Sequence, residues 1–304
     1  MKITENTQKW ILLFVLALTW GSSFFLIKKG VEYFQPMQVG ALRIAIAGIL
    51  LLPFGLYNLK SIPKKTLPWL LLSGFLSNFV PMFLFPMAEV KISSSLAGIL
   101  NSLVPIFVVI IGHFVFHIKS NATQIAGTIL GFVGAFVLIY FSEKQIIAKE
   151  SNHDLLHIGY ILLATICYAT AGLITKKHLS NIPSFRLSTV VFTVLFFPAA
   201  ILLIYNDFYG DFITLNQTEN AFNGLAYVAI LAVFGTALAM IIFYKLIQIS
   251  STVFAASVTY LMPFVAIFWG MFDNEPLQLI HVIGMSIILL GVYLIQYKKK
   301  EEVL

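Results

Sequence analysis

Long apolar runs separated by short polar breaks occupy the chain from end to end. Each run is close to the 20 or so residues that a helix needs to cross the hydrocarbon core of a bilayer. Lysine, aspartate, asparagine and proline residues mark the breaks between the runs. The pattern predicts an all-α integral membrane protein with ten transmembrane helices, over Trp10–Ile27, Pro36–Tyr57, Leu67–Ala88, Ser94–Phe116, Ala122–Phe141, Ile158–Thr175, Ser184–Tyr205, Ala221–Tyr244, Ser251–Phe272 and Leu277–Tyr297.

The composition agrees with this pattern and argues against other protein classes. Of the 304 residues, 59% are hydrophobic and only 11% are charged, whereas an ordinary soluble domain carries roughly a quarter charged residues. So few charges cannot cover a soluble globule, and the same figures exclude disordered, collagen-like and coiled-coil chains. Cys167 is the single cysteine, so the chain has no internal disulfide.

The basic residues predict the orientation in the membrane. If the N-terminus is inside, thirteen lysines and arginines fall in cytoplasmic segments, five fall outside, and Arg43 lies within a span. Cytoplasmic loops favour Lys and Arg, so we expect both termini in the cytoplasm of a multi-pass cell-membrane protein. The formal charge of +6 then reflects the membrane surface and does not indicate nucleic-acid binding. The first run lacks a small-residue cleavage site, which favours an uncleaved helix over a signal peptide.

Motifs for catalysis are missing from the sequence. The connections between runs are too short for a catalytic domain, and the chain has no Gly-Lys dipeptide and hence no Walker A loop. It also has no His-x-Glu or His-Glu-x-x-His motif for an intramembrane metal site. We therefore expect no enzymatic activity, no catalytic residues, no cofactor and no metal.

The chain repeats itself. Trp20–Lys29 (WGSSFFLIKK) aligns with Tyr168–Lys177 (YATAGLITKK). The same order continues downstream, where Ser93, Ala97, Leu103, Pro105 and Gly112 align with Ser251, Ala255, Leu261, Pro263 and Gly270. Each half, residues 1–145 and 146–304, holds five predicted spans. Because five is odd, the second half enters the membrane from the opposite side. Such inverted repeats are typical of transporters, which place the substrate site at the repeat interface near the midplane.

Several short motifs resemble the EamA family of the drug/metabolite transporter superfamily. They are WGSSF at Trp20–Phe24, the span around Arg43, the Ser-rich start and central proline of spans four and nine, and the Gly-x6-Gly spacing in spans five and ten. The family often has a Glu after spans four and nine; Glu275 fits the second position, whereas His117 occupies the first. The resemblance implies a ten-helix bundle that moves small metabolites, often exporting amino acids or related compounds.

Polar side chains recur at the depth of the bilayer midplane. At 1.5 Å per residue, that depth lies roughly ten or eleven residues from either end of a span. Their positions match between the repeats, since Ser22 aligns with Thr170 and Asn101–Ser102 with Thr259–Tyr260. Two interpretations are open: these groups line a substrate site, or they hydrogen-bond neighbouring helices.

Prolines and one arginine add to this set. Pro105 leaves the carbonyl of Asn101 without its helical partner, and Pro81 does the same for Ser77. Arg43 is the one ionised side chain deep in a predicted span; it either binds a substrate carboxylate or snorkels and bonds carbonyls. The candidate substrate-binding residues are Trp20, Ser23, Arg43, Asn78, Phe79, Asn101, Pro105, Tyr168, Thr259 and Tyr260.

These features predict a secondary transporter that moves a small amphipathic metabolite, an amino acid or related compound, by alternating access, with export as the expected direction. A multidrug or lipophilic-compound exporter is the main alternative, followed by a channel or a membrane assembly protein. The expected partners are a small-molecule substrate and the lipid bilayer, with no nucleic acid. Glycines on one face of spans five and ten predict a scaffold or a homodimer surface.

Overall fold

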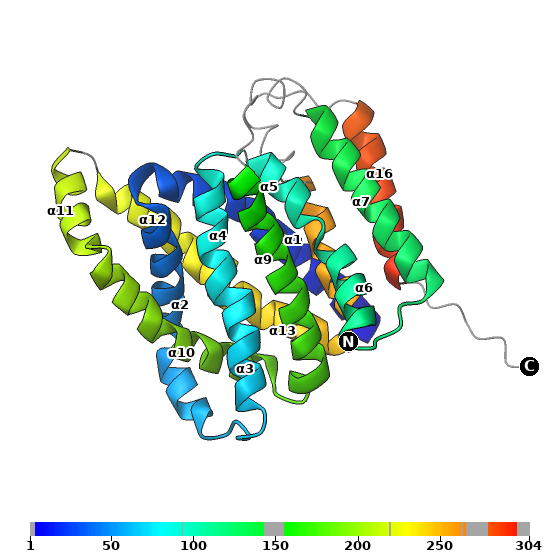
Figure 1. The fold of residues 1–304 in the computed structure, drawn as a ribbon, viewed down its shortest axis with the longest axis horizontal. Coiled ribbons are helices and arrows are strands. Elements are labelled where there is room, and N and C mark those ends of the chain that lie inside the picture. Colours follow the sequence, from blue (N-terminus) through cyan, green and yellow to red (C-terminus); the bar gives the residue numbers. More distant parts are fainter. Residues whose placement is uncertain are drawn as a thin grey trace, which may run out of the picture.

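The computed structural model describes residues 4–92, 94–142, 155–218, 220–262, 264–265 and 279–296, which contain helices and no β-strand (Figure 1). The first half comprises α1 (Glu5–Tyr33), α2 (Pro36–Leu59), α3 (Leu67–Gly74), the π-helix η1 (Phe75–Phe79), α4 (Val80–Glu89), α5 (Ser94–Asn101), α6 (Val104–Phe114) and α7 (Ala122–Ser142). The second half comprises α9 (Leu155–Ile174), η2 (Thr175–Leu179), α10 (Ser184–Tyr205), α11 (Phe208–Thr218), α12 (Ala221–Ala232), η3 (Val233–Leu238), α13 (Ala239–Ile249), α14 (Thr252–Ala256) and α16 (Leu279–Gln296).

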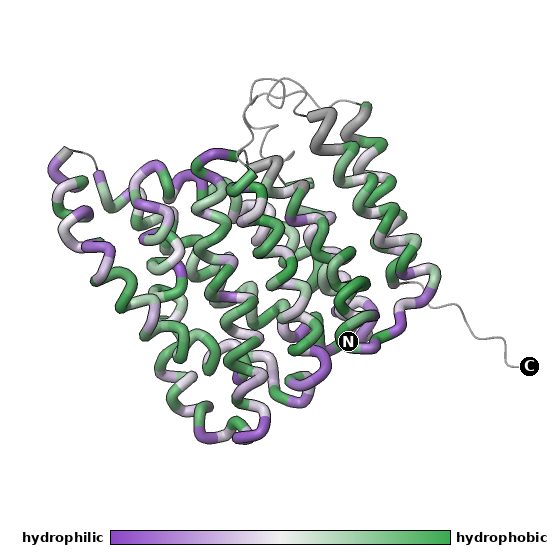
Figure 2. The backbone as a smooth tube through the Cα atoms, in the orientation of Figure 1, coloured by the Kyte–Doolittle hydropathy of each residue, from purple (hydrophilic) through white to green (hydrophobic). Residues whose placement is uncertain are grey.

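The prediction of an all-helical membrane protein is confirmed. Within the described residues, six helical stretches are long and apolar enough to cross a membrane: Glu5–Tyr33, Pro36–Leu59, Leu67–Glu89, Leu155–Leu179, Ser184–Tyr205 and Ala221–Ile249. Four shorter apolar helices accompany them, at Val104–Phe114, Ala122–Val137, Thr252–Met262 and Val282–Ile295. Figure 2 shows hydrophobic residues along the helices and hydrophilic ones gathered at their ends and turns. Pro263, Glu275 and the end of the predicted span Ser251–Phe272 lie outside the described residues.

The structure differs from the expected elements at several places, including these. The predicted span Ser94–Phe116 is broken into α5 and α6 at Ser102–Leu103, because Pro105 near the start of α6 cannot donate a backbone hydrogen bond. The stretch after α10, expected as a connection, contains α11. This helix packs its aromatic residues Phe208 and Phe212 against Phe34 at the end of α1.

Helices that are equivalent in the two repeats pack side by side. The most extensive contacts join α2 to α10 and α7 to α16. In the first pair, Asn58 near the end of α2 donates to Thr189 near the start of α10. At the other end, Gln38 near the start of α2 donates to the carbonyl of Asn206, just after α10. The two helices are therefore antiparallel.

The pair α7 and α16 is also antiparallel, and glycines allow its close approach. A Cβ added to Gly127 would lie 2.6 Å from the carbonyl oxygen of Gly291, and one added to Gly134 would lie 2.9 Å from the backbone nitrogen of Ile288. Residue numbers therefore rise along α7 in the direction in which they fall along α16. These backbones touch because the glycines have no side chain between them.

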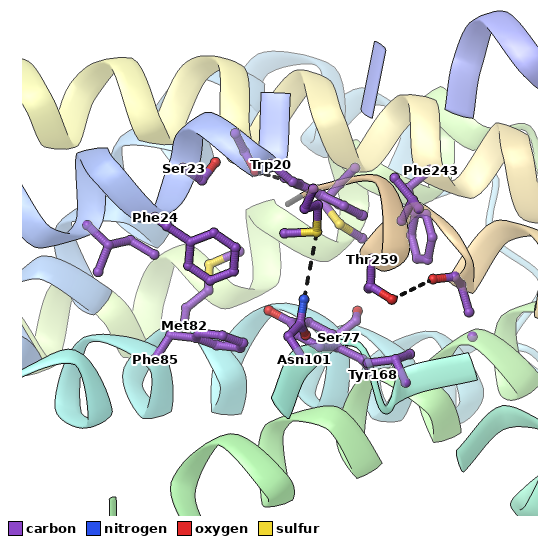
Figure 3. Close-up of a pocket in the computed structure, with 18 of the residues that line it drawn as sticks. Trp20, Ser23, Phe24, Ser77, Met82, Phe85, Asn101, Tyr168, Phe243 and Thr259 are labelled. Atoms are coloured by element: carbon purple, nitrogen blue, oxygen red, sulfur yellow. Dashed lines mark hydrogen bonds between the residues drawn. The ribbon is translucent and has the colours of Figure 1, made fainter. Parts of the chain in front are cut away.

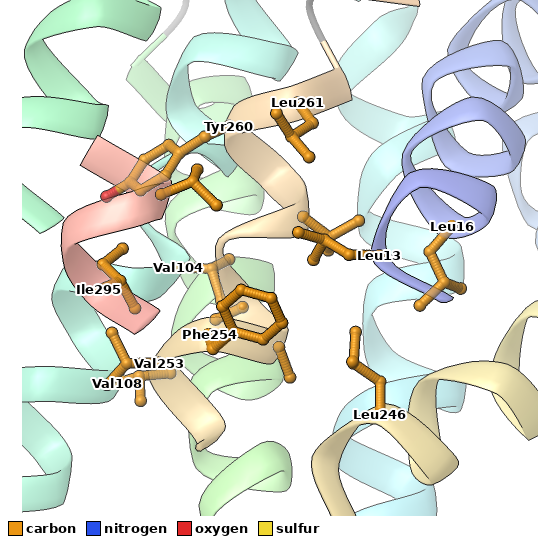
Figure 4. Packing of buried hydrophobic residues seen from close by; sticks show 14 of the residues in the cluster. Leu13, Leu16, Val104, Val108, Leu246, Val253, Phe254, Tyr260, Leu261 and Ile295 are labelled. Carbon is orange, nitrogen blue, oxygen red and sulfur yellow. The ribbon is translucent and has the colours of Figure 1, made fainter. Parts of the chain in front are cut away.

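A buried apolar cluster joins the two halves (Figure 4). It combines Leu13 and Leu16 of α1 with Val104 of α6 and with Phe254 of α14. The ring of Trp10 on α1 meets that of Phe254 edge to face, with centroids 5.2 Å apart. The start of α1 is thereby held against the turn that leads from α13 into α14.

We predict that Gly291→Ala destabilises the protein. Its new Cβ would lie 2.6 Å from the backbone nitrogen of Gly131, so α7 and α16 would have to separate. Overpacking of this kind costs about 1–3 kcal/mol. Thermal unfolding in detergent micelles measures the loss.

Gly159→Ala is the matched control, because nothing lies within 4 Å of a Cβ added there. Alanine is a better helix former than glycine, so this variant should be as stable as the parent or slightly more stable. Equal melting temperatures for the two variants would contradict the close packing of α7 on α16.

Candidate functional site

A central cavity lies among helices of both halves (Figure 3). Its empty space is about 850 Å³ when the space at its open mouth is included. The lining residues come from α1, α2, the η1–α4 stretch, α5 and α6, α9, the η3–α13 stretch and the segment Thr252–Met262. Five of the six long apolar stretches thus contribute to the cavity, all except Ser184–Tyr205, and so do both helices of the broken span.

The lining follows the internal repeat. The alignment that pairs Trp20 with Tyr168 and Asn101 with Thr259 also pairs most other lining residues with each other. These further pairs are Phe24 with Gly172, Ser77 with Gly235, Met82 with Met240, Phe85 with Phe243, and Val104 with Met262. Equivalent positions of the two repeats therefore face one shared space.

Six of the ten candidate residues line this cavity. They are Trp20, Ser23, Arg43, Asn101, Tyr168 and Thr259. Figure 3 shows Asn101 and Thr259 facing each other across the space, with Trp20 and Phe243 on the same side as Thr259. The structure brings together in space residues that lie more than 200 positions apart in the sequence, such as Trp20 and Thr259.

Asn101 places an unused acceptor in the site. Its side chain is 4% exposed, and its amide nitrogen makes a weak hydrogen bond to the sulfur of Met262 at 3.7 Å. Its Oδ1 atom has no hydrogen-bond partner within the described part of the chain. An amide oxygen accepts two hydrogen bonds, so this buried oxygen has unused acceptor capacity.

A π-helical turn positions the polar end of the cavity. The carbonyl of Gly235 in η3 accepts a hydrogen bond from Nε1 of Trp20 at 3.0 Å. Arg43 reaches the same turn, where its Nε donates to Oγ1 of Thr236 at 2.7 Å and its Nη2 lies 3.5 Å from the Gly235 carbonyl. A π-turn shifts the helical hydrogen-bond register, and this places backbone and side-chain acceptors of η3 toward α1 and α2.

Arg43 itself is 7% exposed and forms no salt bridge with any residue that the structure describes. Its two hydrogen bonds use Nε and Nη2, which leaves Nη1 without a partner among those residues. The side chain bonds the η3 turn from within the bundle instead of snorkelling to the membrane surface.

The other four candidate residues lie outside the lining. Asn78 is fully buried and donates to Oγ of Ser77 and to the hydroxyl of Tyr244, at 2.6 and 3.2 Å. Phe79 packs between Phe75 and Phe83.

Pro105 is buried at the start of α6. Tyr260 points toward α7, where its hydroxyl donates to the carbonyl of Thr128 at 2.8 Å. Neighbouring residues on a helix project about 100° apart, so Thr259 and Tyr260 cannot share one direction.

The candidate residues do not include most of the apolar wall. It contains two repeat-matched methionines, Met82 and Met240, and two repeat-matched phenylalanines, Phe85 and Phe243. The signal was present in the repeat alignment, since each of these residues has an identical partner. A search for identical apolar residues at matched positions would have found all four.

Comparison with known proteins identifies the family. The EamA-like transporter family matches the chain twice, over residues 8–140 and 155–297. An uncharacterised transporter of Archaeoglobus fulgidus is 26% identical over 96% of this chain and 100% of its own length. The uncharacterised inner membrane transporter YedA of Escherichia coli K12 is 26% identical over 94% of this chain and 90% of its own.

Two more distant matches agree with this. A protein of Chlamydia trachomatis named as an S-adenosylmethionine/S-adenosylhomocysteine transporter is 23% identical over 95% of this chain and 89% of its own. A solved crystal structure superimposes with a TM-score of 0.70 at 14% identity, over 93% of this chain and 94% of that one, which supports the fold. The two family matches together cover most of the chain, and this multi-pass membrane protein belongs to the EamA-like transporter family.

Proposed function

We propose that this chain is a secondary transporter that carries a small amphipathic metabolite, an amino acid or a related compound, out of the cell by alternating access. It consists of ten transmembrane helices in two inverted repeats, residues 1–145 and 146–304, and it lies in the cell membrane with both termini in the cytoplasm. The observation that carries the proposal is the central cavity lined by equivalent residues of both repeats.

The antiparallel packing of equivalent helices supports the inversion. If the second repeat enters the membrane from the opposite side, each helix must run opposite to its equivalent. α2 and α10 do so, and so do α7 and α16. A site between such repeats is exposed to one side or the other as the halves rock, which is the usual mechanism of inverted-repeat transporters.

The chemistry of the lining supports an amphipathic substrate. Aromatic and methionine side chains form most of the wall, and Asn101, Thr259, Ser77 and Arg43 supply a few polar groups. Small-molecule sites commonly combine an apolar wall with a few polar groups that orient the ligand. An amino acid with an apolar side chain has both parts.

A lipophilic-compound exporter is the second candidate. Met82, Met240 and Met262 all line the cavity. Methionine side chains are flexible and polarisable and adapt to ligands of different shape. A wall rich in methionine therefore favours a broad range of apolar ligands as well.

Counterflow in proteoliposomes tests the proposal. Vesicles loaded with unlabelled amino acids, or in parallel with lipophilic cations, should take up the labelled compound of one class with saturable kinetics. Flux without saturation or exchange would indicate a channel. Folded protein that exchanges nothing in either set would contradict a carrier of these compounds.

We further predict that Asn101→Leu reduces exchange at least about tenfold without unfolding the protein. The substitution removes the unused Oδ1 acceptor of the cavity, and a hydrogen bond to a charged ligand group contributes about 1.5–3 kcal/mol, which is tenfold or more in affinity. Exchange rates and melting temperatures of the purified variant measure both effects.

Asn58→Leu serves as the matched control. Asn58 lies near the end of α2, donates to Thr189 and does not line the cavity. Exchange by this variant should stay within about twofold of the parent, because the affinity of the site is untouched. Normal exchange by folded Asn101→Leu would remove Asn101 from the binding site.

A further inference from the structure

Arg43 brings into the cavity a positive charge that no described carboxylate meets in a salt bridge, and the buried Glu89 acts on it only at longer range. A buried guanidinium without an anionic partner is costly, because desolvation is not repaid by a salt bridge. Thr236 and Gly235 hold Nε and Nη2 and fix the side chain in place, but both offer only neutral oxygens. The remaining nitrogen, Nη1, has no partner among the described residues.

The equivalent position in the second repeat shows that the fold does not require a cation there. α2 and α10 begin at the equivalent residues Pro36 and Ser184, so Arg43 corresponds to Val191. Val191 is 2% exposed and packs against Gly74 of α3. A valine therefore satisfies the same helix contact, and the charge at Arg43 is an addition specific to one side of the cavity.

We infer that Arg43 binds the carboxylate of the ligand, so that the site selects compounds that carry a carboxylate. This inference rests on the proposed function and names its substrate class. Guanidinium groups bind carboxylates in bidentate fashion, and Arg43 presents its free nitrogen at the same cavity as the unused Oδ1 of Asn101. An acceptor and an anion site in one cavity match the ammonium and carboxylate of an α-amino acid.

Paired substrates test this inference. L-Phenylalanine and its methyl ester differ by the carboxylate charge, and any other acid that exchanges in counterflow can be compared with its own ester. The parent protein should exchange the acid at least about tenfold better than the ester. Arg43→Gln should lose this preference while still exchanging the ester, and Arg43→Lys should keep part of it.

Arg186→Gln is the control, because Arg186 at the start of α10 does not line the cavity; it should keep the preference for the acid. An ester exchanged as well as the acid by the parent, or a preference that survives Arg43→Gln, would overturn the inference and leave the transporter intact. The parent comparison decides the matter alone if Arg43→Gln does not fold. A parent that exchanges no compound at all would contradict the proposed function instead.

A second inference comes from a different part of the molecule. Lys176 in η2 donates three hydrogen bonds to backbone carbonyls at the end of α13 and the turn after it, those of Ile247, Gln248 and Ser250, at 2.9, 3.1 and 2.7 Å. An ammonium has three donors, so all of them are used. This contact joins η2, which follows α9, to the turn that leads into α14, two residues before the cavity residue Thr252.

The repeat supplies an equivalent lysine that has no such contact. Lys176 aligns with Lys28, which is exposed and has no hydrogen bond or salt bridge to any described residue. Its neighbour Lys29 pairs with Glu32. Lys28 lies 18 residues after Trp10, whose ring packs on Phe254 beside the Lys176 contact, and is therefore roughly 27 Å away at the opposite end of α1.

The repeat also supplies the matching carbonyls. The alignment that pairs Asn101 with Thr259 pairs Ile247, Gln248 and Ser250 with Glu89, Val90 and Ile92. These three residues lie at the end of α4 and in the turn after it. In an inverted repeat, the two states of the transporter exchange the conformations of the two halves.

We propose that Lys176 and Lys28 are alternating latches. In the state described here Lys176 holds its end of the bundle closed and Lys28 is released. In the opposite state Lys28 binds the carbonyls of Glu89, Val90 and Ile92, and the hydrogen bonds of Lys176 are broken. Only one latch is engaged at a time, and each stabilises one of the two states of the proposed alternating access.

Thiol labelling tests the latches. A Thr252→Cys reporter in a Cys167→Ala background places the thiol in the cavity near the Lys176 end, and a membrane-impermeant maleimide measures its exposure in nanodiscs. Lys176→Met should raise the labelling rate at least about threefold. Lys28→Met should lower it by a similar factor, because it removes the latch of the state in which the Lys176 end is open.

Lys177→Met and Lys29→Met are the neighbouring controls and should leave the rate unchanged. The decisive variant is Lys28→Met, which acts from the far end of the bundle and does not touch the reporter. An unchanged rate in Lys28→Met, or a change in the same direction as in Lys176→Met, would overturn the latch proposal. Exchange by the parent protein is measured separately, so failure of the latches does not count against the transporter itself.

Discussion

A lipid bilayer offers no hydrogen bonds to the backbone, and this constraint decides where the helices of this protein are irregular. Non-helical or loosened backbone at membrane depth is tolerated only against protein or a polar cavity. The turn between α5 and α6 and the π-turns η1 and η3 all adjoin the central space, through the lining residues Asn101, Ser77 and Gly235. The irregular backbone therefore lies beside the cavity, because its freed polar groups need partners or ligands there.

The internal repeat places irregular turns and packed helix pairs at equivalent positions of the two halves. η1 and η3 lie at equivalent positions of the third helix of each half, and Ser77 aligns with Gly235. The equivalent helices α2 and α10 pack against each other, and so do α7 and α16. Because Gly127 and Gly291 let two backbones touch, α7 and α16 form a tight pair beside the bundle and leave the central space to the other helices. Two copies of one helical unit thus enclose a site that neither could enclose alone.

The sequence predicted the parts of this arrangement that depend on apolar length and on the repeat. The helical membrane class follows from runs of about 20 apolar residues, and the facing pair Asn101 and Thr259 follows from polar residues at matched depth. Pro105 and Pro81 signal the break before α6 and the turn η1, because each lacks a backbone donor. No residue gives such a signal for η3, where Ala239 stands at the position of Pro81. The sequence pattern also did not predict the direction in which a side chain projects from its helix. Asn78 and Tyr260 have the expected depth, but they bond to Tyr244 and to the carbonyl of Thr128.

The proposed function requires a cavity with partly repeat-matched walls to distinguish the two ends of its ligand. Part of the apolar wall is symmetric, because Met82 and Phe85 are matched by Met240 and Phe243, and this part cannot orient a molecule. Orientation must come from residues that break the symmetry, and among these Arg43 carries a charge, whereas its repeat equivalent Val191 is apolar and does not line the cavity. A division of roles follows from this. Symmetric residues suit tasks that both states share, such as enclosing the ligand and closing one end in turn, whereas recognition of a ligand with two different ends requires the unmatched ones.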